Sequence, residues 1–150
     1  MSICLSIPDT DQQITYTAFH KADTVRENNY LLDFTYGPDR QRWKTVLKKY
    51  NVIQRTIVYA GNYETITEIG LRREISYING PDGVVAIHVK QSGQADKIYY
   101  PHYDHLGSVV KITGNAAEVF KASYDAWGKR TVTRNTFAWH RGFTGHEHLD

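Results

Sequence analysis

The feature that most constrains the fold of this chain is a turn signal at positions 124–130, with the sequence Tyr-Asp-Ala-Trp-Gly-Lys-Arg. The preceding segment, 119–124, alternates apolar and polar residues, which is the pattern of a half-buried strand. The side chain of Asp125 can accept hydrogen bonds from amides two residues on, and Gly128 can adopt the positive φ that reverses the chain. The pattern therefore predicts a hairpin, with residues 130–133 in the returning strand.

The turn signal recurs along the chain. A close relative, Tyr-Asp-His-Leu-Gly-Ser, lies 21 residues earlier at 103–108, and looser relatives lie at 36–42, 59–62 and 77–80. Recurrence at a period of about 20 to 50 residues indicates a repeat array, and the looser relatives fall at irregular intervals. We expect equivalent turn positions to share one backbone conformation. The residues assigned to this turn motif are Tyr103, Asp104, Gly107, Tyr124, Asp125 and Gly128.

Short strand signals follow one another along the rest of the chain, without the 3.6-residue periodicity of a helix. Eleven tyrosines and eleven glycines fit β-structure with many turns. The predicted fold class is therefore all-β: an antiparallel β-hairpin array that forms a twisted, curved meander sheet. The expected strands cover residues 14–19, 30–36, 43–47, 53–59, 63–69, 71–78, 84–90, 97–100, 109–112, 119–124 and 130–133.

The turn motif resembles the tyrosine-aspartate (YD) repeat of the Rhs family. The similarity extends to residues 34–42 and to residues 141–150, Arg-Gly-Phe-Thr-Gly-His-Glu-His-Leu-Asp, which resemble the opening of the Rhs-associated core region. It covers roughly Tyr30 to Asp150. Residues 1–150 are accordingly expected to form a single YD-repeat domain within a longer chain, with 1–29 outside the similarity.

The resemblance also implies a role. In the Rhs family the sheet spirals into a large hollow shell that encloses a C-terminal effector, often a toxin, and the proteins are bacterial and exported or associated with the cell surface. The expected partners are therefore the remainder of the parent chain and its effector. The expected role is structural and non-enzymatic, without a cofactor. Some family members have an autoproteolytic site, but it would follow Asp150, so no residue here is assigned to it.

Composition limits the other classes of function. A length of 150 residues suits one domain, and a formal net charge of +2 without a long basic run gives no electrostatic case for a nucleic-acid partner. No stretch approaches the ~20 apolar residues that span a bilayer. Residues 1–8 lack the positively charged start of a secretory signal.

Two histidine groups admit a metal-binding interpretation. Neither group has a cysteine pair or a third ligand at a spacing typical of a metal site. We therefore favour the interpretation that these histidines lie in turns and on the surface without binding a metal. The residues concerned are His102, Asp104 and His105 in the first group, and His140, His146, Glu147 and His148 in the second.

Other reactive side chains also have a structural and a chemical interpretation. Asp104 and Asp125 could form a carboxylate pair for hydrolysis, but their matching positions in two turns favour backbone capping. Cys4 has no histidine nearby in the sequence, so an ordinary thiol is favoured over a nucleophile.

Exposed aromatic residues give the main rival function. Trp43, Trp127 and Trp139 offer flat faces that suit the apolar side of a sugar ring, as in a carbohydrate-binding or adhesive surface module. Most tyrosines are expected to pack across strands instead. Residues 14–19 and 137–144 are the expected sheet edges. Unpaired edges seek partners, which predicts that the isolated chain associates with itself.

Overall fold

The computed structural model describes residues 12–136, 139 and 141, and these residues contain strands and turns but no helix. The prediction of an all-β fold is confirmed. The twelve strands are β1 (Gln13–Tyr16), β2 (Ala22–Glu27), β3 (Tyr30–Tyr36), β4 (Arg42–Lys49), β5 (Val52–Ala60), β6 (Tyr63–Glu68), β7 (Leu71–Gly80), β8 (Gly83–Gln91), β9 (Lys97–Tyr103), β10 (Val109–Gly114), β11 (Ala117–Tyr124) and β12 (Arg130–Asn135).

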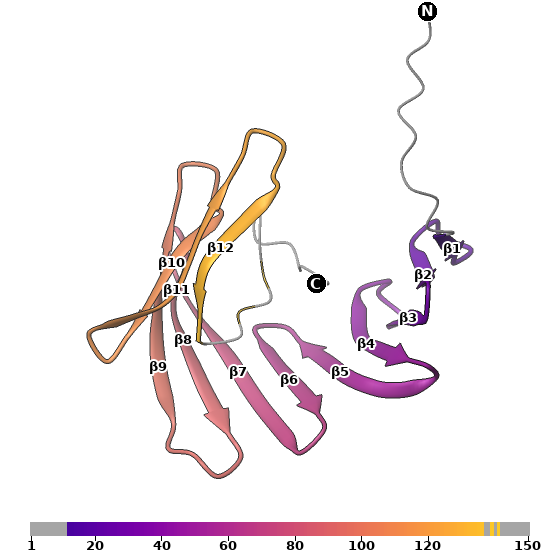
Figure 1. Ribbon diagram of the computed structural model, residues 1–150, viewed down its shortest axis with the longest axis horizontal. Helices are drawn as coiled ribbons and strands as arrows, with labels where there is room; N and C mark the ends of the chain where they lie inside the picture. The colour runs from indigo at the N-terminus through magenta and orange to yellow at the C-terminus, as the bar shows by residue number, and fades with distance from the viewer. Residues whose placement is uncertain (1–11, 137–138, 140, 142–150) are drawn as a thin grey trace, which may run out of the picture. The chain divides into compact units, whose positions relative to one another are not determined.

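The strands follow one another in the sheet in chain order, from β1 to β12 (Figure 1). Antiparallel neighbours of this kind need only short turns between them, and the turn-rich sequence supplies these turns. The antiparallel meander expected from the sequence is therefore present. The chain divides into two compact units, Met1–Glu74 and Ile75–Asp150, which we call unit 1 and unit 2 and describe separately.

The structure differs from the expected strand bounds near the start of the chain. The expected strand at 14–19 ends at Tyr16, because the amide of Thr17 donates to the carbonyl of Lys21 at 2.8 Å and closes a turn. β2 was not predicted, since its sequence has no apolar face and relies on pairing with β1 and β3. Of the expected edge at 137–144, only Trp139 and Arg141 lie within the described residues.

The core of unit 1 is a row of side chains that crosses four strands. Phe34 pairs with Thr45, Thr45 with Ile57, and Ile57 with Ile66, so the four side chains lie on one face of the sheet. All four are buried. Each fully buried isoleucine or phenylalanine contributes about 1.5 to 3 kcal/mol, so this row stabilises the register of β3 to β6.

Unit 2 has a corresponding core. Ile112 of β10 pairs with Phe120 of β11, and both side chains are fully buried. Ile75 on β7 and Ile87 on β8 are also completely covered. The alternation seen in the sequence of β11 therefore does separate a buried face from an exposed one.

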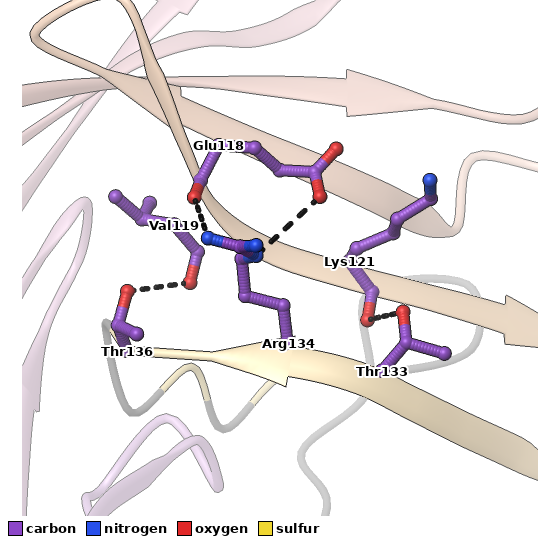
Figure 2. A network of polar contacts seen from close by, with 6 residues as sticks. All are labelled: Glu118, Val119, Lys121, Thr133, Arg134 and Thr136. Carbon is purple, nitrogen blue, oxygen red and sulfur yellow. Dashed lines mark hydrogen bonds and ion pairs between the residues drawn. The ribbon is translucent and has the colours of Figure 1, made fainter.

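Polar contacts fasten the exposed strand β12 to β11 (Figure 2). The guanidinium of Arg134 donates to the carbonyl of Glu118 at 3.4 Å and lies 3.7 Å from its carboxylate. The hydroxyls of Thr133 and Thr136 donate to the carbonyls of Lys121 and Val119 at 3.3 and 3.0 Å. Exposed contacts of this kind contribute little individually, about 0 to 1 kcal/mol, so β12 is held mainly by its backbone ladder.

Candidate functional site: the tyrosine turns

Two turns of unit 2, between β9 and β10 and between β11 and β12, contain the sequence motif. In each turn the amide of the aspartate donates to the carbonyl four residues on, and the amide of the glycine donates to the carbonyl of the aspartate. The distances are 3.0 and 3.1 Å for Asp104 and Gly107, and 3.1 and 3.0 Å for Asp125 and Gly128. The two turns therefore have the same backbone hydrogen bonds.

The aspartate side chains close the same two turns. Oδ1 of Asp104 accepts hydrogen bonds from the amides of Leu106 and Ser108 at 2.9 and 2.8 Å. Oδ1 of Asp125 accepts from the amides of Trp127 and Lys129, both at 2.9 Å. Each carboxylate thus satisfies backbone donors of its own turn. This arrangement is backbone capping, and it leaves the hydrolytic pair of Asp104 and Asp125 without structural support.

The glycines are favoured at these positions by backbone conformation and not by a lack of space. Gly107 and Gly128 have φ values of 80° and 81°, in the region that L-residues rarely adopt. A Cβ atom built on Gly107 would meet nothing within 4 Å. A side chain at this position would therefore fit sterically with its neighbours but would strain its own backbone.

The tyrosine that precedes each turn reaches back to an earlier strand. The hydroxyl of Tyr124 donates to the carbonyl of Val109 at 3.1 Å, and that of Tyr103 donates to the carbonyl of Val84 at 3.0 Å. Val109 is the first residue of β10, the strand that leaves the turn following Tyr103. Each turn is thus tied to the hairpin before it.

Partial burial shifts the ionisation of both tyrosines. Loss of solvent raises the pKa of Tyr103 and of Tyr124 above the usual 10.0. The positive charge of Arg141 opposes the shift in the pKa of Tyr103, and that of Arg130 opposes the shift for Tyr124. The folded state therefore favours the neutral phenol, which is the form that donates the hydrogen bond.

Unit 1 contains the same kind of turn between β3 and β4. The amide of Gly37 donates to the carbonyl of Gln41 at 2.9 Å, and the amide of Arg40 donates to the carbonyl of Gly37 at 2.9 Å. Arg40 has a φ of 58°, so it occupies the position that glycine holds in unit 2. The hydroxyl of Tyr36 donates to the carbonyl of Ala22 at 2.6 Å. We call these bonds from Tyr36, Tyr103 and Tyr124 the tyrosine clamps.

A fourth turn of this type, between β1 and β2, was missed in the sequence. The amide of Thr17 donates to the carbonyl of Lys21 at 2.8 Å, and the amide of His20 donates to the carbonyl of Thr17 at 3.0 Å. His20 has a φ of 60°. The Thr17 hydroxyl accepts from the amide of Lys21 at 3.2 Å, in place of an aspartate. The spacing of 20 residues from Tyr16 to Tyr36 was the signal that could have revealed it.

The looser relatives at 59–62 and 77–80 differ from these four turns. Ala60 pairs with Tyr63, so Gly61 lies in a two-residue turn, with a φ of 60°. Tyr77 lies inside β7, three residues before its end at Gly80. These segments resemble the motif in sequence but do not form its turn, because their chain reversals are shorter or lie elsewhere.

The structure gives the metal interpretation no support within its described part. No group of three potential ligands occurs among the described residues. His102 instead shares a hydrogen bond with the hydroxyl of Thr113, at 3.1 Å, and His105 is exposed in its turn. The calls on Cys4, His140, His146, Glu147 and His148 concern residues outside the described part of the chain.

The three tryptophans have different surroundings. Trp127 is 93% exposed at the tip of the β11–β12 turn, and Trp43 on β4 is 42% exposed. Trp139 is only 4% exposed, so in this structure its indole offers little surface to a ligand. The indole of Trp139 packs edge-on against the ring of Tyr77, with 6.4 Å between the ring centroids. The backbone amide of Trp139 donates a hydrogen bond to the side-chain oxygen of Asn135 at 2.8 Å.

Comparisons with known proteins add no relative: no family model matches the chain, and no curated protein matches it. No helix among the described residues is long and apolar enough to cross a membrane. The resemblance to YD repeats thus rests on the sequence motif alone.

Proposed function

We propose that this chain is a non-enzymatic structural module, a length of YD-repeat sheet that forms part of the wall of an Rhs-type carrier. The observation that carries the proposal is the equivalence of two tyrosine clamps. Tyr124 bonds to Val109, which is six residues after Tyr103, and Tyr36 bonds to Ala22, which is six residues after Tyr16. The same link between successive turns therefore occurs in both units.

A repeated link of this kind suits a wall rather than a reaction centre. The repeated geometry of the turns holds backbone groups. The carboxylates of Asp104 and Asp125, which a hydrolytic reaction would need, accept hydrogen bonds from backbone amides at 2.8 to 2.9 Å. An open antiparallel sheet also extends by adding further hairpins. The remainder of a parent chain and a C-terminal effector are the partners that this proposal implies.

The test uses the native gene and its full product. Expression of the complete open reading frame, followed by limited proteolysis, measures whether a domain downstream of Asp150 is protected. Under the proposal the downstream domain survives protease concentrations that digest the same domain expressed alone. A downstream domain cleaved equally fast in both forms, or a reading frame without one, contradicts the carrier role.

One observation favours a second candidate, a glycan-binding or adhesive module. Trp127 presents an indole that is 93% exposed on a turn fixed by Asp125. An exposed indole ring is the kind of group on which sugar rings stack. Binding to a glycan array that is lost in Trp127→Ser, and kept in the matched variant Trp43→Ser, would support the adhesive role.

A further inference from the structure

The turns at the other ends of the unit 1 strands expose a group of large apolar side chains. These turns connect β2 to β3, β4 to β5 and β6 to β7, whereas the tyrosine turns lie at the opposite strand ends. Exposed fractions range from 43% for Tyr30 to 79% for Ile69. We call the group the end patch, and it consists of Tyr30, Tyr50, Val52, Ile53 and Ile69.

Backbone pairing brings the members of the end patch to one end of the sheet. The amide of Tyr50 donates to the carbonyl of Asn29 at 2.9 Å, which joins the β4–β5 turn to the β2–β3 turn. Arg55 pairs with Glu68, the residue before Ile69, and this pairing brings the β6–β7 turn beside the start of β5. Three hairpin turns separated in sequence thus lie at one end of the sheet. At this end the pairing of Lys49 with Tyr30 and Val52 places these side chains on one face, and Ile53, which pairs with Lys48, lies on the other.

Tyr50 has an unfavourable backbone conformation at the tip of its hairpin. Its φ is 49°, and that of Asn51 is 64°, as in a turn with two positive φ angles. Asparagine and glycine adopt this conformation readily, but a bulky tyrosine does so at a cost. Strain of this kind concentrates at functional positions, where the side chain rather than the backbone is needed.

The charges around the end patch leave a small positive excess. Within two residues of the three turns there are four cations, at positions 26, 48, 49 and 72, and two carboxylates, at 27 and 68. Lys48 and Arg72 form ion pairs with Asp33 at 3.8 Å and Glu74 at 3.0 Å, and Glu68 forms one with Arg55 at 2.6 Å. With these partners included, five cations face four carboxylates, so the net charge is 5 − 4 = +1. The ammonium of Lys49 lies over the ring of Tyr30, 5.0 Å from its centroid. The hydrogen bond with Tyr30 raises the pKa of Lys49 above the usual 10.5, and a lysine is already protonated at neutral pH at that usual value.

We propose that the end patch docks on the surface of a lipid bilayer that contains anionic lipids. Tyrosine side chains have an apolar ring and a polar hydroxyl, which suits them to the boundary between headgroups and acyl chains. Val52, Ile53 and Ile69 add aliphatic area, and lysines beside them can extend toward lipid phosphates. This inference rests on unit 1 alone and is independent of the proposed carrier role.

Vesicle binding of the intact 150-residue chain tests the proposal. Sedimentation with phosphatidylcholine vesicles containing about a third phosphatidylserine is compared with sedimentation with pure phosphatidylcholine vesicles. We expect binding to the anionic vesicles only. Replacement of Tyr50→Asn together with Ile53→Thr is expected to weaken the partition coefficient at least about tenfold, because apolar contact area is lost. Lys49→Gln is expected to weaken it about fivefold.

Matched controls separate loss of binding from loss of folding. Tyr50→Asn relieves the positive-φ strain, so its thermal midpoint should equal or exceed that of the unchanged chain while its binding falls. Trp127→Ser and Lys129→Gln, at a turn of unit 2, should leave binding unchanged. Equal binding to both kinds of vesicle, or full binding by the double variant, would overturn the proposal. Self-association of the free chain that the double variant abolishes would assign the end patch to a second copy and also overturn it.

Discussion

The hydroxyl of Tyr124 donates a hydrogen bond to the carbonyl oxygen of Val109, 3.1 Å away, and so ties the β11–β12 turn to the strand that leaves the turn before it. Tyr36 makes the equivalent bond to Ala22 at 2.6 Å. A tyrosine is long enough to reach across to a neighbouring strand, which a serine or threonine in its place would not do. The tyrosine of the motif therefore acts between repeats, whereas the aspartate and glycine act within one turn.

Loss of one clamp should destabilise the chain modestly. Tyr124→Phe keeps the ring but removes the donor to Val109, and the expected cost is about 0.5 to 1.5 kcal/mol of unfolding free energy. Urea titration followed by circular dichroism measures this cost. Tyr100→Phe is the matched control, because Tyr100 is about half exposed, and its expected effect is near zero. Equal effects of the two substitutions would show that the clamp contributes nothing.

The aspartate caps predict a second, separable effect. Asp125→Ala removes the acceptor for the amides of Trp127 and Lys129, at an expected cost of about 0.5 to 2 kcal/mol. Asp125→Asn keeps one side-chain oxygen and should cost less. Thermal unfolding of both variants measures these costs. The control is Asp82→Ala, which removes an aspartate from the turn between β7 and β8. A cost for Asp82→Ala as large as that for Asp125→Ala would argue against capping.

Backbone strain predicts the outcome at Gly128. Gly128→Val should cost about 1 to 2 kcal/mol, since a β-branched residue is disfavoured at a φ of 81°. Gly128→Asn should cost less, because asparagine tolerates this region. Ala126→Val, in the same turn but without a positive φ, controls for added bulk. If Gly128→Val and Ala126→Val unfold at the same denaturant concentration, conformation is not the reason for the glycine.

The ionisation of the clamp tyrosines predicts how stability depends on pH. The folded-state pKa of Tyr103 and of Tyr124 is raised above 10.0, so the folded chain holds these protons more tightly than the unfolded chain. Their contribution is thus fully present below pH 10 and is lost as the pH rises through the folded-state pKa values. Above pH 10 the unfolding free energy of the double variant Tyr103→Phe/Tyr124→Phe should fall less steeply with pH than that of the unchanged chain. An unchanged pH profile would be inconsistent with clamps that need the neutral phenol.

The terminal strands predict association of the isolated chain. β1 and β12 are the first and last strands of the sheet, and their residues are almost entirely exposed. Unpaired strand edges favour pairing between molecules, and a charge on an edge strand opposes it. Sedimentation velocity at several concentrations should show self-association that Ile14→Lys or Val132→Lys reduces. A chain that stays monomeric at high concentration would contradict this expectation.

The sequence was informative where local chemistry determines the backbone. The turns at 103–108 and 124–130 could be predicted because aspartate and glycine each have one physical reason to be there. The turn at Thr17 was missed because threonine and a histidine at a φ of 60° replace those residues, and the surrounding sheet imposes the conformation. β2 was missed for a related reason: it is defined by its partners and not by an apolar face.

Side-chain exposure was harder to predict than strand order. Trp127 and Trp139 look alike in sequence, yet one is almost fully exposed and the other buried against Tyr77. That contact joins residues 62 positions apart, so no local pattern contains it. The end patch has the same origin, since its five side chains are brought together by pairing between β4, β5 and their neighbours.

The tyrosine clamps also bear on how the length of such a chain can change. A clamp connects a turn only to the hairpin before it, so each added unit of about 20 residues needs one neighbour and no distant partner. Duplication or deletion of a unit therefore leaves the remaining contacts in place. The free energy of unfolding should increase by a similar amount with each added unit. The number of units can therefore change in evolution without loss of the fold.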